Sequence, residues 1–509
     1  MAAKYALDGN GCEQMKVLLL NLPSPTGLRV LRDFGGGFGT ASTITKGSRQ
    51  TIFPPLHETF AAAILEKEGF EVSVLDGQTR SLSPSELLAV IEKQNPAVII
   101  CRVSAPSFTN DLMIISLIKE KLPNIFLVGW GSLCKMAAQE VLDKSKLDLV
   151  VGEAELEFVV SQVLERIQSG KSPDSATLQN KVRYVDYSEN QIVRNLDMLP
   201  PPAYHLLNMK EYVAEEYGFV PGSSRNRMLQ FSSVLGSHGC SFNCMYCVYP
   251  VVFGKWRGRS PTKMVDDVEV LVKNYSVKVI WFEDQAFSMD VNRAAVICDE
   301  IIKRHLDVYW ACETRADKLP AELLRKMKKA GCSRIQLGIE TGDPSLFKKL
   351  GKSGCNLETV TKSIKAIQNE GIILETNFIV GLPGESWETV KGTAAFIDKF
   401  KPDVFSVSLA TPYPGTELYD LAERNNWIVT KDWNKYGLSK PVLNMPTFTA
   451  QDMEKAREYL VSEASFKRQL NQTANDLRHG KLGKVAKDVF ANISQVPKQV
   501  YRLAKRKTH

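Results

Sequence analysis

The feature that most constrains the fold of this chain is an alternation of short apolar runs with longer segments of helical spacing, which occurs twice. Repeated strand–helix–strand units of this kind predict parallel sheets with helices on both faces. In the first series the predicted strands are Lys16–Leu22, Phe70–Leu75, Ala97–Cys101, Ile125–Val128 and Leu149–Val151. We therefore expect an α/β domain whose ligand would sit off the carboxyl ends of the strands.

The second series carries six predicted strands, at Leu229–Leu235, Val277–Phe282, Val308–Cys312, Ser333–Gly338, Ile373–Val380 and Val404–Leu409. Six consecutive strand–helix units predict a partial (β/α)6 barrel of the TIM type, with its active site at the C-terminal ends of the strands. The expected domains are a Rossmann-like sheet domain over residues 1–170, a polar linker subdomain over 171–227, the barrel over 228–440 and a helical basic region over 441–509.

A long stretch rich in Gly, Ser and Thr separates the first predicted strand from the helix that contains His57. It includes the run Gly35-Gly36-Gly37-Phe38-Gly39. Long connections without elements of their own are uncommon in compact domains and are often functional. We therefore expect a binding loop or a lid here, not a regular element.

Composition places the chain among soluble globular proteins. Hydrophobic residues make up 44% of its 509 residues and charged residues 24%. No apolar run approaches the roughly 18–20 residues that span a bilayer. The N-terminus lacks the features of a signal peptide, and most of the ten cysteines stand alone in apolar segments. This cysteine pattern fits a reducing compartment, so we expect a cytoplasmic protein.

The positive charge is concentrated at the C-terminal end. From Arg478 onward there are nine basic residues and one acidic residue, against a formal net charge of +7 for the whole chain. The body is therefore close to neutral, and we expect no nucleic-acid partner. Apolar residues from Leu482 to Leu503 recur at steps of three and four, which predicts a basic amphipathic helix that Pro497 interrupts. Such a helix either lies on an anionic membrane surface or docks on the barrel.

Three crowded cysteines follow the first strand of the second series. Cys240, Cys244 and Cys247 have the spacing C-x3-C-x2-C. Thiolates are soft ligands that suit iron–sulfur clusters or zinc. Three of them can hold three corners of a cubane and leave the fourth iron open, whereas a structural zinc site is normally closed by a fourth ligand. His238 directly precedes the loop and is poorly placed to close such a site. An iron–sulfur cluster is therefore the favoured interpretation.

This loop, with Tyr246 at the aromatic position before the third cysteine, resembles the signature of the radical SAM superfamily. The resemblance implies a [4Fe–4S] cluster on the three cysteines, with S-adenosylmethionine (SAM) bound to its unique iron. It also implies one-electron cleavage of SAM to methionine and a 5′-deoxyadenosyl radical, with a reductant such as flavodoxin or ferredoxin.

Later strand ends resemble further segments of the family in the expected order. Each has an ordinary interpretation as turn chemistry or a helix cap, but all fall where a barrel places its active site. The residues expected to bind the cofactors here are Tyr246, Asp284, Arg315, Glu340, Thr341 and Gly381. The candidates for catalysis are Glu283, Cys312 and Tyr413, and Glu375 and Asn377 are further pocket-facing candidates. For Cys312 a core position is the competing interpretation.

The N-terminal domain resembles the cobalamin-binding domain that precedes the barrel in a large radical SAM subgroup. The residues expected to contact cobalamin are Asp76, Gln78, Ser104, Ala105, Gly129, Gly131, Gly152, Glu153 and Glu155. One departure is that Asp76-Gly77-Gln78 lacks the histidine of the D-x-H-x-x-G motif, which ligates cobalt in methionine-synthase-type domains. Either cobalamin binds without a protein nitrogen ligand, or the domain has lost its cofactor and acts as a scaffold.

The resemblance implies one of two chemistries at an unactivated carbon. Cobalamin-dependent C-methylation of a lipid, a tetrapyrrole or another natural product is the favoured one. Cyclisation or oxidation, as in the anaerobic oxidative cyclases, is the alternative. A non-catalytic cobalamin or metal sensor is an alternative of another class, and it predicts no deoxyadenosine. An RNA methylthiotransferase would need three further cluster cysteines, which Cys12, Cys101 and Cys134 are poorly placed to supply.

Overall fold

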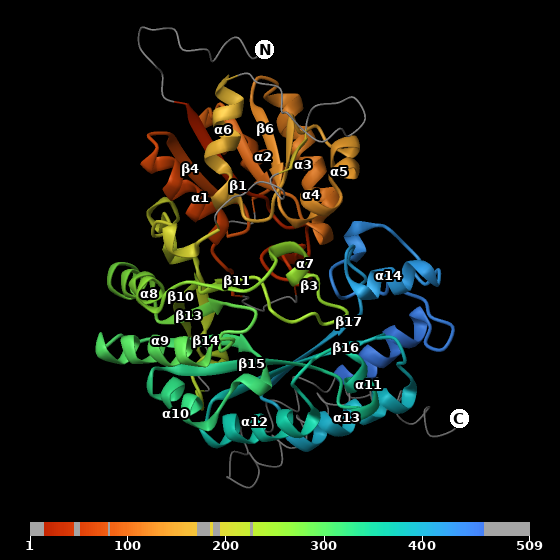
Figure 1. Cartoon of the computed structure of the whole chain (residues 1–509). Helices are drawn as coiled ribbons and strands as arrows, with labels where there is room; N and C mark the ends of the chain where they lie inside the picture. The colour runs from red at the N-terminus through yellow and green to blue at the C-terminus, as the bar shows by residue number, and fades with distance from the viewer. Residues whose placement is uncertain are drawn as a thin grey trace, which may run out of the picture.

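The structure is a computed structural model that describes residues 15–44, 51–79, 82–169, 184–186, 194–223 and 227–462. Two sheets organise these residues. The first belongs to the N-terminal domain, in the upper part of Figure 1, and the second to the barrel below it. Helix α7 (Tyr249–Phe253) and strand β3 (Thr40–Thr43) lie between the two.

The N-terminal sheet has six parallel strands in the order β4-β1-β5-β6-β7-β8. Their bounds are β1 Lys16–Asn21, β4 Glu71–Asp76, β5 Val98–Arg102, β6 Phe126–Trp130, β7 Leu149–Gly152 and β8 Tyr184–Asp186. The order reverses at β1, which has β4 on one side and β5 on the other. In open α/β sheets, ligands bind at such a reversal. The expected Rossmann-like domain is confirmed.

Both faces of this sheet are buried, which explains why its strands are continuous apolar runs. Leu18 and Leu20 of β1 pack into one core cluster, whereas Val17 and Leu19 pack into another. Helices α1 (Leu56–Lys67) and α6 (Val160–Ser169) cover the second face. The helices with buried residues in the first cluster are α2 Pro84–Gln94, α3 Phe108–Lys121, α4 Ser132–Met136 and α5 Ala138–Lys144.

The barrel sheet is open, with the order β17-β16-β15-β14-β13-β10-β9. Six strands are parallel: β10 Met228–Leu235, β13 Val279–Glu283, β14 Tyr309–Thr314, β15 Cys332–Glu340, β16 Ile373–Val380 and β17 Val404–Leu409. Strand β9 (Val213–Glu215) adds an antiparallel edge to β10. The expected partial (β/α)6 barrel is confirmed, and each of its six strands lies within two residues of a predicted one at its ends.

Helices cover the outside of the barrel, and the largest core cluster lies between them and the sheet. Their bounds are α8 Pro261–Tyr275, α9 Val291–Lys303, α10 Ala321–Lys329, α11 Pro344–Lys349, α12 Leu357–Asn369, α13 Trp387–Phe400 and α14 Glu417–Arg424, followed by a helix over residues 450–462. Strand residues alternate between this core and the barrel interior. Phe282 and Trp310 face the helices, whereas Trp281 and Ala311 face inward.

The glycine-rich stretch contains regular structure that the sequence did not predict. Strands β2 (Leu28–Leu31) and β3 pair antiparallel to form a two-stranded ribbon. Gly37 follows β2 in a turn with φ +77°, and a Cβ there would lie 2.3 Å from the Ser132 Oγ. The ribbon therefore packs closely onto the carboxyl edge of the N-terminal sheet. The expectation of an irregular loop was wrong, because short, half-exposed strands next to four clustered glycines give almost no periodic signal in the sequence.

The segment predicted as a linker is divided between the two halves. Its described strand β8 joins the N-terminal sheet through β7, and β9 joins the barrel. Tyr212, next to β9, donates a hydrogen bond of 2.8 Å to the carboxylate of Asp76 at the end of β4. The linker residues therefore bridge the two sheets, and the domain limits expected for this segment stay predictions.

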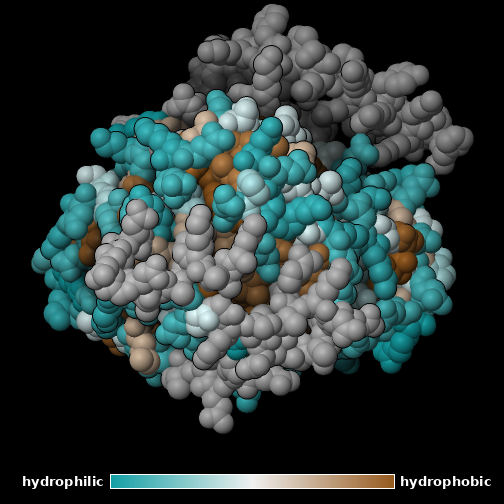
Figure 2. Space-filling model, turned by 90° about the horizontal axis from the view of Figure 1, so that it is seen from above, coloured by the Kyte–Doolittle hydropathy of each residue, from teal (hydrophilic) through white to brown (hydrophobic). Residues whose placement is uncertain are grey.

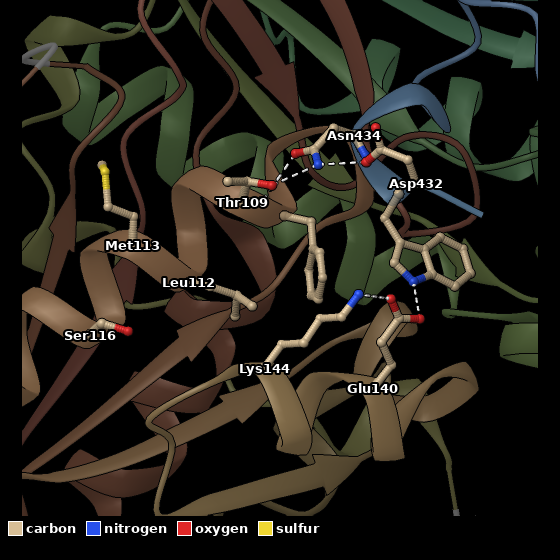
Figure 3. Close-up of a pocket in the computed structure, with 10 residues that line it drawn as sticks. Thr109, Leu112, Met113, Ser116, Glu140, Lys144, Asp432 and Asn434 are labelled. Carbon is tan, nitrogen blue, oxygen red and sulfur yellow. Dashed lines mark hydrogen bonds and ion pairs between the residues drawn. The ribbon is translucent and has the colours of Figure 1, made fainter. Parts of the chain in front are cut away.

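The N-terminal domain also contacts the chain that follows the barrel strands, and we call this contact region a seam. Here α3 and α5 meet a short 3-10 helix, η9 (Trp433–Lys435). In Figure 3 the side chain of Asn434 points toward Thr109. The Asn434 amide donates a hydrogen bond of 2.7 Å to the Thr109 hydroxyl, and the indole N–H of Trp433 donates one of 2.7 Å to Glu140. These contacts line a surface pocket of about 430 Å³. Residues more than 290 positions apart in the chain are thereby held together.

The face seen from above carries mostly hydrophilic side chains where the structure describes it, with smaller hydrophobic areas between them (Figure 2). In the described ranges, none of the helices combines the length and apolar character needed to cross a bilayer. The basic amphipathic helix predicted between Leu482 and Leu503 lies outside the described residues.

Candidate active site at the barrel mouth

The cysteine loop begins where the first barrel strand ends. After β10 the chain forms β11 (Ser237–His238), which pairs with β12 (Arg257–Gly258). Gly239 then turns with φ +74°, and a Cβ there would lie 2.2 Å from the carbonyl oxygen of Lys255. Only glycine fits so close to another backbone. The sequence therefore turns sharply into Cys240, at the C-terminal mouth of the barrel.

Backbone hydrogen bonds fix the loop on three sides. The Cys240 N–H donates to Gly254, the Met245 N–H to Leu350, and the Leu418 N–H to the carbonyl of Met245. The Cys247 N–H closes a turn onto the Cys244 carbonyl at 2.9 Å. These hydrogen bonds anchor the loop that presents the three thiols.

All three thiols line a cavity of about 660 Å³. This volume lies within the roughly 300–1,000 Å³ that is typical of small-molecule sites. One wall is the β2–β3 ribbon, and the others come from the ends of β14 to β17. Its polar lining residues include Gln285, Glu313, Arg315, Gln336, Glu340, Lys352, Glu375, Asn377, Ser406, Ser408 and Thr411.

The donor set fits a [4Fe–4S] cluster with one open iron. Apart from the three thiols, the described cavity lining contains no further cysteine and no histidine. Among the described residues, the one group of three such ligand atoms within 4.8 Å of one another belongs to His57, Glu157 and His238, so at least one pair of the three thiols is further apart than that. Four thiolates about 2.3 Å from one zinc ion would stand closer together than that. The wider spacing suits a cubane.

Burial raises the pKa of all three thiols. Two nearby charges act on the pKa of the Cys240 thiol in opposite directions: Arg315 lowers it, whereas Glu313 raises it. Metal ligands must be deprotonated, so cluster binding at these cysteines would release protons. The charges around the cavity alone do not keep the three cysteine side chains deprotonated.

Glu340 lies beside the cysteine loop at the end of β15. The pairing of β15 with β16 is interrupted between Gly338 and Glu340, and Glu340 has φ +71°. A non-glycine residue in this region is strained. Its carboxylate is largely buried and pairs with Lys352 at 2.7 Å. The strain and the buried ion pair together direct one carboxylate into the cavity, next to Cys244.

Arg315 marks the end of β14 on the other side of the loop. Its guanidinium stacks on the ring of Phe242, with 3.6 Å between its central carbon and the ring centroid. Asp317 holds the same guanidinium at 2.9 Å, and the Ser353 carbonyl accepts a hydrogen bond of 2.8 Å from it. Arg315 therefore supports the loop between Cys240 and Cys244 and carries positive charge into the cavity.

A polar floor lies deeper in the barrel. Glu313 and Gln336 point inward from β14 and β15, and Glu375 and Asn377 from β16. Arg334 pairs with Glu375 at 2.7 Å. Burial raises the pKa of Glu313 to about 8, and Glu340 and Glu375 add to the shift as nearby like charges. The cavity thus contains a carboxyl group that holds its proton at neutral pH.

The comparisons with known proteins agree with this geometry. Residues 234–397 match the family model described as the radical SAM superfamily. The chain carries a radical SAM domain. Its matched segment runs from the end of β10 to within α13 and contains the cysteine loop.

Relatives resemble more of the chain than the radical SAM domain alone. An uncharacterized methyltransferase of Pyrococcus horikoshii is 28% identical over 80% of this chain and 86% of its own length. An anaerobic magnesium-protoporphyrin IX monomethyl ester cyclase of Rubrivivax gelatinosus is 24% identical over 77% of this chain and 70% of its own. Both kinds of chemistry expected from the sequence therefore occur among the relatives.

Two solved structures share the fold around the radical SAM domain. The radical SAM methyltransferase TsrM of Kitasatospora setae, with cobalamin and a [4Fe–4S] cluster bound, has a TM-score of 0.61 at 18% identity and covers 82% of this chain and 79% of its own. OxsB, with aqua-cobalamin and SAM bound, has a TM-score of 0.65 at 16% identity and covers 96% of this chain and 71% of its own. The N-terminal domain and the radical SAM domain thus have the fold of cobalamin-dependent neighbours.

Several residues predicted for the site lie at the cavity. They are Cys240, Cys244, Tyr246, Cys247, Arg315, Glu340, Glu375, Asn377 and Tyr413. Tyr413 uses its hydroxyl to bind the Tyr436 carbonyl at 2.8 Å, and its ring packs on Phe38. It therefore forms part of the wall, where it joins the ribbon to the barrel.

Four other predicted residues lie elsewhere. Cys312 packs in the outer core, because the residues beside it in β14 take the inward positions. Thr341 bonds the Thr393 hydroxyl and the Asp343 backbone N–H. Gly381 turns against Met453 with φ +93°. Asp284 accepts from the Ser237 hydroxyl and faces Arg293, so it supports the approach to the cysteine loop.

Glu283 lies in a separate small cavity of about 30 Å³ between the N-terminal domain and the barrel. Burial raises its pKa to about 8, and Asp33 contributes as a nearby like charge. One of its carboxylate oxygens has no hydrogen-bond partner among the described residues. The structure thus places Glu283 behind the cavity of the thiols, at the seam between the two halves.

Sequence reasoning missed Lys352, Glu313 and Gln336. Lys352 follows α11 and carries no motif of its own, so only the fold reveals that it reaches Glu340. A signal existed for the other two. Side chains of a strand alternate between its faces. Because Arg315 points into the barrel, Glu313, two residues earlier, is expected to point inward as well. Gln336, four residues before the inward-pointing Glu340, is expected on the same face.

The residues expected to contact cobalamin lie at the carboxyl edge of the N-terminal sheet, but other side chains cover them. Ser104, Ala105, Glu153 and Glu155 are fully buried. A Cβ at Gly129 would lie 2.4 Å from Leu147, one at Gly152 would lie 2.2 Å from the Tyr184 hydroxyl, and one at Gly131 would lie 3.2 Å from Arg102. The space behind the strand ends is filled by the domain itself.

The acidic residues expected to contact cobalamin already have polar partners within the protein. Asp76 accepts hydrogen bonds from Asn21, Tyr212 and the backbone N–H of Gln78, and burial raises its pKa to about 6. Arg194 pairs with both Glu153 and Glu155. Arg257 of β12 adds an ion pair of 3.0 Å with Glu155. These carboxylates therefore tie the N-terminal domain to the barrel.

Between these strand ends and the barrel, the described side chains leave little open space. The cavity beside Gln78 measures about 20 Å³, far below the roughly 300 Å³ at which small-molecule sites begin. The β2–β3 ribbon separates the strand ends from the large cavity, since Leu31, Gly36 and Thr40 form its wall.

Proposed function

We propose that this chain is a radical SAM enzyme that modifies an unactivated carbon of a small or lipid-like substrate in the barrel cavity. One observation carries the proposal. Three thiols, without a fourth cysteine or a histidine in the described lining, face a cavity of about 660 Å³ that is rich in polar strand-end residues. When bound, a [4Fe–4S] cluster supplies the electron that splits SAM into methionine and a 5′-deoxyadenosyl radical.

We assign different residues of the chain to the binding of the cluster, SAM and the substrate. Cys240, Cys244 and Cys247 hold three irons. Glu340 would accept hydrogen bonds from the amino group of SAM, and Lys352 holds that carboxylate in place. Arg315 supports the loop and offers its charge to the SAM carboxylate. The polar floor at Glu313, Gln336 and Asn377 orients the substrate, and the β2–β3 ribbon closes the cavity toward the N-terminal domain.

C-methylation is the outcome that we propose first. It is supported by the methyltransferase relative and by the two neighbours that share the fold across both halves of the chain. Cobalamin is the cofactor that both neighbours bind. Because the strand ends of this chain are packed by its own side chains, the test measures bound cobalamin directly.

Oxidation or cyclisation is the second candidate, and one residue favours it. Glu313 lies in the cavity with a pKa of about 8. At neutral pH such a carboxyl group can exchange a proton with a substrate whose carbon has been oxidised. The similarity to the anaerobic cyclase supports the same alternative.

The electron is proposed to come from a flavodoxin or a ferredoxin. Membrane contact through the basic region between Leu482 and Leu503 is a further proposal, and it concerns residues outside the described ranges.

The test is an anaerobic purification from cells supplied with iron and cobalamin. We expect a broad iron–sulfur absorption band and formation of 5′-deoxyadenosine when the reduced protein receives SAM. Replacing Cys240, Cys244 and Cys247 with alanine should abolish both, whereas Cys355→Ala, a half-buried thiol outside the cavity lining, should leave both unchanged. A triple variant that still forms deoxyadenosine would refute the proposal.

Product masses separate the two outcomes. Retained cobalamin and substrates that gain a methyl group support methylation. Absence of cobalamin, together with substrates that lose hydrogen, supports the oxidative alternative.

A further inference from the structure

Three buried side chains that the proposed function does not use meet at the seam between the N-terminal domain and the barrel. They are His57 of α1, Glu157 of the 3-10 helix η3 (Leu156–Phe158) and His238 of β11. Each is at most 5% exposed. Residues from three distant parts of the chain thus bring two imidazoles and one carboxylate together in one buried site.

Their spacing matches that of ligands around one metal ion. One ligand atom from each residue lies within 4.8 Å of the others. The His57 Nδ1 is 2.8 Å from a Glu157 oxygen, and the rings of His57 and His238 lie 5.2 Å apart between centroids. Ligands at about 2.0–2.2 Å from a tetrahedral zinc ion stand roughly 3.3 Å from one another. Only small side-chain movements would therefore bring the three onto one ion.

A second observation points to a missing cation. The side chain of Glu157 is fully buried, yet its Oε1 has no hydrogen-bond partner among the described residues. Glu58, the next residue after His57, likewise has a buried carboxylate oxygen without a partner there. Leaving buried carboxylate oxygens unpaired is costly. A divalent cation would satisfy the Glu157 oxygen directly.

Outer carboxylates are placed as metal-bound histidines require. A metal-ligating imidazole usually donates its other N–H to a carboxylate or carbonyl. The His238 Nδ1 lies 2.5 Å from Glu155, which leaves its Nε2 for a metal. If the His57 Nδ1 binds the ion, its Nε2 faces Asp33 at 3.9 Å. Arg257 and Arg102 in turn hold these two outer carboxylates.

Space for one further ligand exists beside the group. The cavity of about 30 Å³ at the seam is lined by Asp33, His57, His238 and Glu283. A single water occupies about this volume. Two imidazoles, one carboxylate and a water complete a tetrahedral set that suits zinc.

We propose that His57, Glu157 and His238 bind one zinc ion at this seam. The ion would pin η3 of the N-terminal domain to β11, and His238 lies only two residues before Cys240. Its role would be to hold the N-terminal domain against the barrel at this seam. This assignment is independent of the chemistry in the barrel cavity.

Metal analysis of the whole protein tests the proposal. Because zinc can enter empty cysteine loops, the first arm uses the full chain with Cys240, Cys244 and Cys247 changed to alanine. We expect about one zinc per chain after dialysis, which falls at least fivefold when Glu157→Gln is added. His205→Gln removes a surface histidine that pairs with Glu66, and it should leave the zinc content unchanged.

A second arm keeps the cluster. In the iron-loaded protein, Glu157→Gln should remove zinc without lowering the iron content. Titration of the cysteine-free chain with cobalt(II) should produce the visible absorption bands of a tetrahedral site, and these bands should be absent in the His57→Gln variant. No zinc in the cysteine-free chain, and no cobalt bands on titration, would overturn the proposal and leave His57 and Glu157 as an ion pair.

Discussion

At the residue scale, alternation along the barrel strands decides which side chains reach the cavity. The strand ends were recognisable from their motifs, and about half of the residues predicted there line the cavity. Cys312 did not, because a one-residue step in a strand exchanges its two faces. Lys352 could not be predicted at all, since its role depends on a contact with Glu340 that only the folded barrel creates.

Glu313 gives a pH-dependent prediction. Its pKa rises from 4.5 to about 8 on folding, mainly through burial. The unfolded chain therefore releases this proton above pH 4.5 while the folded protein keeps it, so the contribution of Glu313 to stability is lost as the pH rises toward 8. The loss is about 1.4 kcal/mol per pH unit.

Glu313→Gln should remove this dependence. Thermal unfolding of the iron-free protein should show the variant gaining stability relative to the wild type between pH 5 and pH 8. The exposed Glu358, changed to Gln, serves as the control and should shift nothing of this kind. A difference between Glu313→Gln and wild type that does not vary with pH would contradict the prediction.

At the scale of elements, the parallel strands were predictable and the ribbon was not. Buried runs such as those of β1 and β16 are apolar on one or both faces and stand out in the sequence. The ribbon β2–β3 is short, half exposed and next to the run of glycines from Gly35 to Gly39. Its shape is set by packing onto Ser132 and Pro106 across the domain, which no local pattern encodes.

The turn into the cysteine loop supplies a prediction at this scale. Gly239→Ala should lower iron content and the unfolding temperature, because its Cβ would meet the Lys255 carbonyl in a left-handed conformation. Gly222→Ala is the matched control, since Gly222 has φ +73° with open space around it. Both variants pay roughly 1–2 kcal/mol for the backbone conformation, but only Gly239→Ala should lose iron. Equal iron contents would contradict the clash.

At the scale of the whole molecule, two seams hold the N-terminal domain on the barrel. One is the network of buried charges around Glu155, and the other is the aromatic contact of Phe38 with Tyr413 and Trp433. The fold of each half was predictable from its strands. Their relative placement was not, because it depends on pairs such as Trp433 and Glu140 that are far apart in the chain.

Trp433→Ala tests the aromatic seam. The change removes a mostly buried indole and its hydrogen bond to Glu140, and truncations of this size cost about 3–5 kcal/mol. Hydrogen exchange should quicken in α3 and the β2–β3 ribbon. Trp427→Ala removes a partly buried side chain that packs against the barrel core, and it should leave exchange in α3 unchanged. Equal protection of α3 in both variants would show that the seam does not depend on Trp433.

The hydrogen bond from Leu418 to the cysteine loop has a consequence for biosynthesis. Leu418 lies beyond the last barrel strand, so the loop acquires its full set of backbone partners only after nearly the whole barrel has left the ribosome. Iron delivered earlier would meet three thiols on an unfinished loop. We therefore expect cluster assembly on this chain to be a late maturation event that takes place at the mouth of a folded barrel.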